Sequence, residues 1–336
     1  MTHKIITWDL GATKCAVAVV DYDKHQNHLH CKQSGLIKIR DCISLDQLTQ
    51  ELENVLDMKM SHADAICIGA AGQYNGESLQ LAAGYPYAMH FAALAKQYNW
   101  PVFSVIHDYS PIVCATFTNY FEEPSNIKRL NAVPLHPLGR RIALGIGTGI
   151  GLKDGILFEN GDFWLGTNEF GHIGVVMPPS ASKQTLERHN ALLYFLREKY
   201  ILKKDEGLSF EKLLAGQGMA HMHHFFYPDQ KNKTIEEVGD LVRQKKAPET
   251  LAAYAWYVGL LVGTAQLSFM PDGGVWLTGG VVLNHLEIFE QDDFFLGIEA
   301  SPAYLNLRQQ FPLGILCGKD HAFMGGAYYA SKRLLD

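Results

Sequence analysis

The sequence predicts a duplicated α/β fold, because one order of elements occurs twice along its 336 residues. Each copy begins with three short apolar strands joined by glycine turns, and continues with helices that alternate with buried strands. A chain of this length is long enough for two domains of about 150 residues each. The two copies share no obvious sequence identity, so the duplication is one of pattern.

The elements of the first copy follow from apolar periodicity and turn residues. The turn Gly11-Ala12-Thr13 joins two β-branched apolar segments, which predicts two neighbouring strands. Ser44 and Gln47 stand at capping-box spacing ahead of leucines that recur on one helical face. The expected strands are 4–9, 15–21, one within 28–39, 65–71 and 101–108, and the expected helices are 44–60, 86–98 and 110–121.

The second copy begins at residue 141 and repeats the order. Thr234 and Glu237 again stand at capping-box spacing, which predicts a helix start. The expected strands are 141–147, 151–158, 162–167, 274–278 and 313–317, and the expected helices are 184–200, 209–224, 234–246, 248–270 and 321–335.

Composition excludes several classes of protein. Apolar residues make up 47% of the chain and charged residues 19%, so a large core is expected and general disorder is not. The net charge of −6 and the lack of a long basic run argue against binding to nucleic acid or to an anionic membrane. The apolar run within residues 1–10 is too short for a signal peptide, and Asp9 interrupts it. The six cysteines form no C-x-x-C pair, which argues against a disulfide framework or a structural zinc site and favours the reducing cytoplasm.

Residues 251–271 contain no charged side chain and are long enough to suggest a membrane span. However, the segment carries Thr264, Gln266 and Ser268, and no second span follows it. We therefore expect a central helix buried inside a large domain.

Three glycine turns are candidate phosphate-binding loops. Small residues let backbone N–H groups approach an anion, and a Thr hydroxyl adds a donor. The first turn, 9–14, could equally be an ordinary hairpin turn. The second turn, 145–151, fits neither the P-loop nor the G-x-G-x-x-G pattern. The third turn, 278–280, leaves a strand and opens a helix, where a nucleotide could pack.

In their order along the chain, these motifs resemble those of the bacterial glucokinases, ATP-dependent sugar kinases of the hexokinase, actin and heat-shock chaperone superfamily. Asp9 to Thr13 resembles the first phosphate loop, 105–109 the segment of the catalytic base, and 147–149 the second phosphate loop. Residues 169–172 resemble the E-x-G-H sugar motif, 209–216 a later sugar-binding segment, and 273–282 the adenosine motif. The sister family of repressor-related sugar kinases shares some of these motifs but adds a cysteine-rich zinc motif, and 173–202 contains no cysteine.

The resemblance implies the two-domain actin-like ATPase (ribonuclease H-like) fold with a duplicated βββαβαβα core. The expected small domain is 1–118 plus 318–336, and the large domain is 119–317. It also implies ATP and Mg²⁺ as cofactors, with Asp9 holding the metal through water, a hexose as substrate, and a homodimer in the cytoplasm. The residues that would contact the nucleotide are Trp8, Asp9, Leu10, Gly11, Ala12, Thr13, Gly147, Thr148, Gly149, Gly279 and Gly280.

Besides His107, four side chains are candidates for catalysis and sugar binding. Asp108 ends an expected buried strand and would take the proton of the attacking hydroxyl, although an Asp there also suits a helix N-cap. Glu169, His172 and Glu211 resemble the sugar ligands of the family. Taken singly, the two glutamates would be solvated residues of a loop and a first helical turn, and His172 a core histidine.

Departures from the family pattern bear on the sugar. His107 replaces the family's sugar-binding Asn, either as another sugar ligand or only to fill space. The T-N segment of the family has no clear match around 81–85, and Trp8 stands where glycine is usual. His221, His223 and His224 could suggest a metal, but a solvated helix end is the expected environment. We therefore expect 6-phosphorylation of a hexose, glucose first, with mannose, an amino sugar or a non-catalytic sensor as alternatives.

Overall fold

The computed structural model describes residues 1–81, 85–176, 182–200 and 207–334. The chain forms two compact units. The first comprises Met1–Lys128, Lys153–Gly166 and Leu316–Asp336, and the second comprises Arg129–Leu152 and Thr167–Ile315. The domain boundaries expected from the sequence, 1–118 plus 318–336 and 119–317, stay a prediction.

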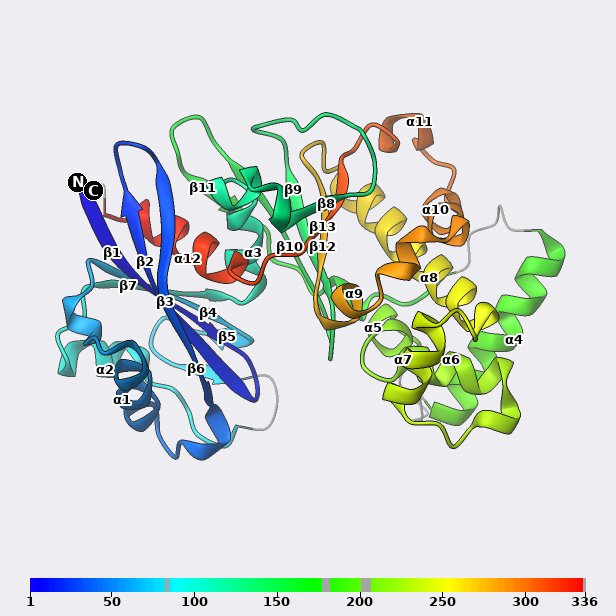
Figure 1. The fold of residues 1–336 in the computed structure, drawn as a ribbon, viewed down its shortest axis with the longest axis horizontal. Coiled ribbons are helices and arrows are strands. Elements are labelled where there is room, and N and C mark those ends of the chain that lie inside the picture. Colours follow the sequence, from blue (N-terminus) through cyan, green and yellow to red (C-terminus); the bar gives the residue numbers. More distant parts are fainter. Residues whose placement is uncertain (82–84, 177–181, 201–206, 335–336) are drawn as a thin grey trace. The chain divides into compact units, whose positions relative to one another are not determined.

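The first sheet has the strand order β3-β2-β1-β4-β7 (Figure 1). The first three strands are antiparallel neighbours, whereas β4 and β7 continue the sheet in parallel with β1. The strands are β1 (Thr2–Leu10), β2 (Lys14–Asp23), β3 (His28–Lys38), β4 (Ala65–Ala70) and β7 (Val102–His107). All five expected strands of the first copy are therefore confirmed.

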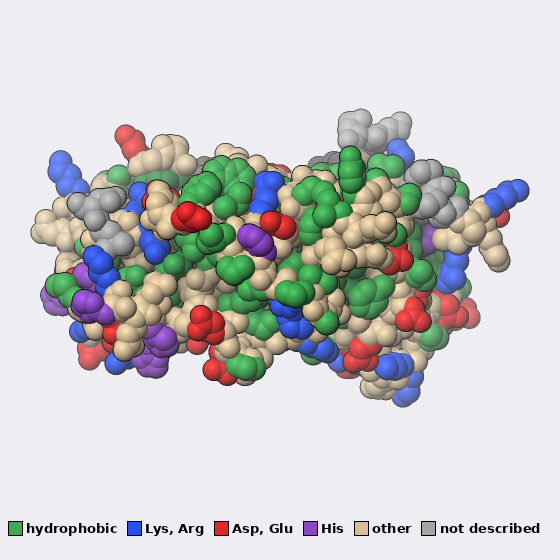
Figure 2. Space-filling model, turned by 90° about the horizontal axis from the view of Figure 1, so that it is seen from above, with side chains coloured by type: hydrophobic (Ala, Val, Ile, Leu, Met, Phe, Trp, Pro, Cys, Tyr) green, Lys and Arg blue, Asp and Glu red, His purple; other side chains and the backbone are tan. Residues whose placement is uncertain are grey.

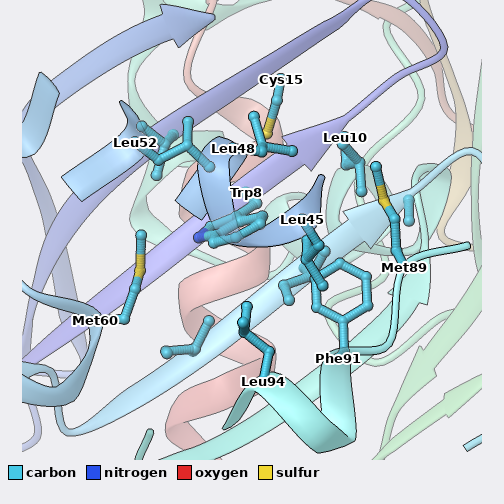
Figure 3. Close-up of a cluster of buried hydrophobic side chains, with 14 of the residues drawn as sticks. Trp8, Leu10, Cys15, Leu45, Leu48, Leu52, Met60, Met89, Phe91 and Leu94 are labelled. Atoms are coloured by element: carbon cyan, nitrogen blue, oxygen red, sulfur yellow. The ribbon is translucent and has the colours of Figure 1, made fainter. Parts of the chain in front are cut away.

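The two faces of this sheet have different covers. One face packs against α1 (Leu45–Leu56) and α2 (Phe91–Gln97), and its centre is Trp8, which is 2% exposed and makes edge-to-face contacts with Phe91 and Trp100 (Figure 3). The opposite face packs against α12 (His321–Ser331), which also contacts α3 (Tyr109–Ala115). Because successive side chains of a strand point to opposite faces, Trp8 points away from the face of Asp9, as expected.

The second sheet has the strand order β11-β10-β9-β12-β13-β8. Its strands are β8 (Ile127–Arg129), β9 (Arg141–Ile146), β10 (Ile150–Leu157), β11 (Phe163–Leu165), β12 (Gly274–Thr278) and β13 (Leu313–Leu316). Numbered within each copy, the order third-second-first-fourth-fifth occurs in both sheets, and the fourth and fifth strands are parallel to each other in both. This shared topology confirms the duplication, with β8 as an additional edge strand.

Helices of the second unit follow the expected order, except that one expected helix is broken and that α10 (Asp292–Glu299) and α11 (Leu305–Arg308) were not expected. The expectation of one helix over 209–224 is wrong, because the helix is interrupted at Gly216, whose φ is +52°. The helices are α4 (Lys183–Tyr200), α5 (Phe210–Leu214), α6 (Gly218–Phe226), α7 (Ile235–Arg243), α8 (Pro248–Phe269), α9 (Gly280–Asn284), α10 (Asp292–Glu299) and α11 (Leu305–Arg308). The capping box of Thr234 and Glu237 forms with both of its hydrogen bonds.

Helix α8 settles the ambiguity of the uncharged segment. Among the described residues it is the one helix long and apolar enough to cross a membrane, and 83% of its most apolar window is buried inside the protein. It packs against α10 and against α6. The expectation of a buried helix is confirmed.

On the face drawn in Figure 2, acidic and basic side chains are interspersed among apolar ones.

Three expectations for the first copy need correction. Helix 86–98 is shorter, since α2 begins at Phe91, and helix 110–121 ends as α3 at Ala115 and is followed by a separate 3-10 turn, Asn119–Glu122. Strand β7 is an edge strand of half-buried residues, so the expected buried strand before Asp108 is wrong. The hairpin of β5 (Gly72–Tyr74) and β6 (Leu79–Leu81) was not expected. Residues 82–84 of the departure noted at 81–85 lie outside the described residues.

The core position of Trp8 gives a stability prediction. Replacing Trp8 by Ala should lower the free energy of unfolding by about 3–5 kcal/mol, because a large fully packed ring leaves a cavity behind. Urea denaturation followed by circular dichroism measures the change. Tyr194→Ala is the control, since Tyr194 is 69% exposed and its loss should change stability by less than about 0.5 kcal/mol. An equal effect of the two substitutions would contradict the packing derived for Trp8.

Candidate active site

Two carboxylates of the first unit lie at the carboxyl ends of parallel strands. Asp9 is next to the last residue of β1, and Asp108 follows the last residue of β7. Both strands pair in parallel with β4, Asp9 opposite Gly69 and His107 opposite Ala70. The backbone N–H of Asp108 also donates to the carbonyl of Ala70 (3.1 Å). This is the edge of a parallel sheet where α/β proteins bind their ligands.

Asp108 is the N-cap of α3, and one of its oxygens remains available. Oδ1 accepts the backbone N–H of Tyr109 (3.0 Å) and lies 2.8 Å from Nδ1 of His107. The Asp108 side chain is 24% exposed. Oδ2 makes no hydrogen bond to any residue that the structure describes. The cap and the proton-accepting group are therefore compatible roles, because each can use its own oxygen.

His107 is a neighbour of the candidate base and not a filler of space alone. Nδ1 of His107 lies 2.8 Å from Oδ1 of Asp108, so the ring contacts the candidate base directly. The backbone N–H of Tyr109 also points at this nitrogen, at 3.3 Å. Nε2 then remains for a ligand, on a side chain that is 28% exposed.

Asp9 is held in an environment that disfavours its charge. Burial, with the nearby Asp108 carboxylate as the second cause, raises the pKa of Asp9 from 3.8 to about 6. The same two carboxylates, together with a larger effect of burial, raise the pKa of the Tyr109 phenol above its usual range. Sequence reasoning missed Tyr109 as a neighbour of both carboxylates, although its position directly after Asp108 was a usable signal.

The turn between β1 and β2 is closed by a backbone hydrogen bond and carries one exposed hydroxyl. The N–H of Gly11 donates to the carbonyl of Lys14 (3.0 Å), which closes the turn. The side chains of Trp8 and Leu10 belong to the core cluster, so only their backbones could contact a nucleotide. Thr13 is exposed, and its hydroxyl is available to an anion.

In the second unit, the carboxylate of Glu211 is hydrogen-bonded to the second glycine turn. Glu211 lies in the segment that resembles a sugar-binding motif. Its Oε2 accepts the backbone N–H of Ile150 (2.9 Å), at the start of β10. A Cβ at Gly149 would lie only 2.9 Å from the same oxygen, so any larger residue there would displace the Glu211 carboxylate from its present position. The N–H of Gly216 donates to the carbonyl of Gly147 (2.8 Å), which joins the turn to the end of the α5 segment.

The E-x-G-H motif forms the 3-10 turn Phe170–His172 beside this site. Nδ1 of His172 lies 3.9 Å from Oε1 of Glu211. The His172 side chain is 62% exposed, so the core-histidine interpretation is wrong. Glu169 is exposed, and its carbonyl accepts the N–H of His172 (3.1 Å). His172, Glu211 and the 147–149 turn are therefore neighbours within one unit.

The third glycine turn connects β12 to α9. Gly279 has φ +97°, a conformation that strongly favours glycine, and a Cβ there would lie 2.5 Å from the carbonyl oxygen of Ile146. A Cβ on Gly147 would lie 3.7 Å from the backbone nitrogen of Gly280, so the second and third turns lie side by side. Open space faces Gly280. Two adjoining glycine turns form a cradle that fits the phosphates of a nucleotide.

The three histidines of α6 are packed, so the expected solvated helix end is wrong. His223 is fully buried, with ring nitrogens near Thr250 (3.1 Å) and Gln230 (3.2 Å). His221 stacks on Tyr200 at 3.9 Å, and burial lowers the pKa of His221 to about 4. No group of three or more His, Cys, Asp or Glu that could hold a metal occurs among the described residues.

Comparisons with known proteins agree with the topology. The sequence model of the glucokinase family matches residues 6–333. A glucokinase of Saccharophagus degradans is 21% identical over 97% of both chains. Among solved structures, a glucokinase from an Antarctic psychrotroph superimposes with a TM-score of 0.80 at 16% identity, covering 98% of this chain and 99% of the other. A ROK family glucokinase from Streptomyces griseus, in complex with glucose and AMPPNP, gives 0.57 at 16% identity over 98% and 99%.

The match to the glucokinase family model, together with the fold shared with the solved glucokinases, identifies a sugar kinase of the actin-like ATPase fold. The chain belongs to the glucokinase family.

The raised pKa of Asp9 gives a prediction on stability against pH. Between pH 4 and pH 6 the folded protein keeps a proton on Asp9 that the unfolded chain has lost, so this group makes stability fall as the pH rises through that range. Asp9→Asn should therefore raise the free energy of unfolding at pH 7.5 by about 1–3 kcal/mol and leave stability at pH 4 almost unchanged. Urea denaturation at both pH values measures this. Stabilisation of equal size at both pH values would contradict the electrostatic cause.

Proposed function

We propose that this protein transfers the γ-phosphate of ATP to the 6-hydroxyl of a hexose, with glucose as the preferred acceptor. The observation that carries the proposal is a carboxylate, Asp108, held by a helix start and by His107 while its Oδ2 stays unbonded among the described residues. A sugar hydroxyl is a poor nucleophile at neutral pH, so a carboxylate oxygen must accept its proton as attack proceeds. The glucose and AMPPNP bound to the Streptomyces griseus relative support these two substrates.

In this proposal, Glu169, His172 and Glu211 bind the sugar hydroxyls, and His107 adds a contact through Nε2. Glu211 has a second role: because Oε2 holds the N–H of Ile150, the same side chain fixes the turn proposed to bind phosphates. Sugar binding and phosphate binding are thereby joined through one carboxylate. The nucleotide contacts proposed are Asp9 to Thr13, 147–149 and 279–280, with only the backbones of Trp8 and Leu10 taking part.

The side chains present fit a magnesium ion that arrives with the nucleotide. Magnesium prefers oxygen ligands and keeps several waters, so it needs one carboxylate and not a cage of protein ligands. Asp9 suits this role, because a nearby cation would relieve the disfavoured charge caused by burial and by Asp108. When bound, the ion would neutralise charge on the phosphates.

We also propose a cytoplasmic homodimer. The cytoplasmic location is in keeping with six cysteines that are all free thiols.

The test is turnover of ATP with magnesium against a panel of glucose, mannose and glucosamine. Asp108→Asn should lower kcat with glucose by about 10²–10⁴-fold, because the amide accepts no proton, while glucose binding measured by calorimetry stays within about twofold. Asp229→Asn, an exposed position of the second unit, is the control and should keep full activity.

The outcomes separate the alternatives. Turnover with another hexose only, lost in Asp108→Asn, would keep the mechanism and change the acceptor. Binding of sugar or ATP without turnover of any sugar would contradict the kinase proposal and favour a sensor. Full activity in Asp108→Asn would remove Asp108 as the base.

His107 allows a second prediction. His107→Ala should raise the KM for glucose by about tenfold or more, because a hydrogen bond to the sugar is lost, and should lower kcat as Asp108 loses its neighbour. His107→Asn restores a donor of similar reach and should recover most of both losses. Steady-state kinetics with glucose and mannose measure the change. Unaltered KM in His107→Ala would show that this ring does not contact the sugar.

A further inference from the structure

A cavity of about 560 Å³ lies beside the first glycine turn, within the first unit. Its lining includes Thr13, Lys14, Lys38, Arg40, Tyr85 and Tyr87. The volume is within the usual range of small-molecule sites, about 300–1,000 Å³. Ala12 and Thr13 of the first glycine turn belong to this lining, whereas the base, the proposed sugar ligands and the second and third glycine turns do not.

The two lysines of the lining lie opposite each other on neighbouring strands, where their charges repel. Lys14 of β2 pairs directly with Lys38 of β3 in the antiparallel register. Like charges directly opposite each other on neighbouring strands destabilise a sheet. Neither lysine has an acidic partner among the residues that the structure describes. Elsewhere on β3 the charge is compensated, since Nζ of Lys32 lies 3.3 Å from Asp21.

A third cation extends this charged wall. Arg40 follows the end of β3, and its Nε lies 3.8 Å from Oδ1 of Asp41, with both side chains largely exposed. Such an exposed pair is weak, and the other guanidinium nitrogens stay available. Three cationic side chains therefore line the cavity next to one weak acidic partner. An anionic ligand with more than one charge would offset this excess.

The remaining wall is aromatic and apolar. The hydroxyl of Tyr85 donates to the carbonyl of Cys42 (2.9 Å), which fixes its ring in the wall. Tyr87 contacts that ring edge-to-face, with centroids 5.4 Å apart, and is 47% exposed. Ile43 and Pro86 complete this side. Aromatic rings supply rigid apolar surface for the body of a ligand.

We propose that this cavity binds a phosphate monoester with a ring-shaped or apolar body. Lys14, Lys38 and Arg40 hold the phosphate, and Tyr85 and Tyr87 contact the body. Thr13 links the cavity to the first glycine turn, so an occupant would be felt by that turn. The binding itself requires no turnover, and its failure would leave the proposed kinase activity untouched.

Isothermal titration of the full chain tests the proposal, with phenyl phosphate, ribose 5-phosphate and inorganic phosphate as probes. Saturating glucose and AMPPNP are present, so that the proposed substrate sites are occupied. At least one of the two esters should bind, and more tightly than inorganic phosphate. Lys38→Gln should weaken that binding by about tenfold, as expected for one charge-assisted hydrogen bond. Lys32→Gln, on the same strand but with its own acidic partner, should change it by less than about twofold.

Three further variants test whether the ester binds in this cavity or at the proposed substrate site. Glu169→Gln should leave ester binding unchanged, and Tyr87→Ala should weaken the ester but not inorganic phosphate. Lys38→Glu should abolish binding and raise the melting temperature above that of Lys38→Gln, because it turns a repulsive cross-strand pair into an attractive one.

Several results would overturn the proposal. These are no binding of either ester at millimolar concentration, binding insensitive to Lys38→Gln, loss of binding in Glu169→Gln, or inorganic phosphate binding as tightly as the esters. Each would show that the cations and the tyrosines do not act together on one ligand.

Discussion

Parallel pairing of β1, β4 and β7 is the constraint on which the first half of the site depends. It brings Asp9 and Asp108, which are 99 positions apart in the sequence, to the same edge of one sheet. Burial, with the nearby Asp108 carboxylate as the second cause, then raises the pKa of Asp9. A site strained in this way favours the binding of cationic partners, and the packing of Trp8 on the opposite face supports it.

In the second unit, one carboxylate holds the second glycine turn in its conformation. A glycine turn that exposes N–H groups to a ligand has little to hold its own shape. Glu211 supplies this support by accepting the N–H of Ile150, and Gly216 adds a bond to the carbonyl of Gly147. The side chain that resembles a sugar ligand is therefore also structural. Its removal would disturb more than the sugar contacts.

The local patterns predicted most of the elements, and the errors have identifiable causes. The capping box at Thr234 and the alternation around Trp8 are short-range effects, and both are found in the structure. Helix 209–224 reads as continuous because its periodicity passes through Gly216, whose positive φ depends on contacts with a distant turn. The burial of β7 was overestimated because an edge strand and a central strand can have similar sequences.

The sequence by itself determined the duplicated strand order, the glycine turns and the residue types that phosphoryl transfer needs, because hydrophobic periodicity and turn chemistry act over a few residues. Only the tertiary structure decided which polar groups meet. The bond of Glu211 to Ile150, the approach of Asp9 to Asp108, and the packing of the α6 histidines all join segments that the sequence separates. The position of Lys14 opposite Lys38 is also a result of tertiary structure, since the register between strands depends on the whole sheet.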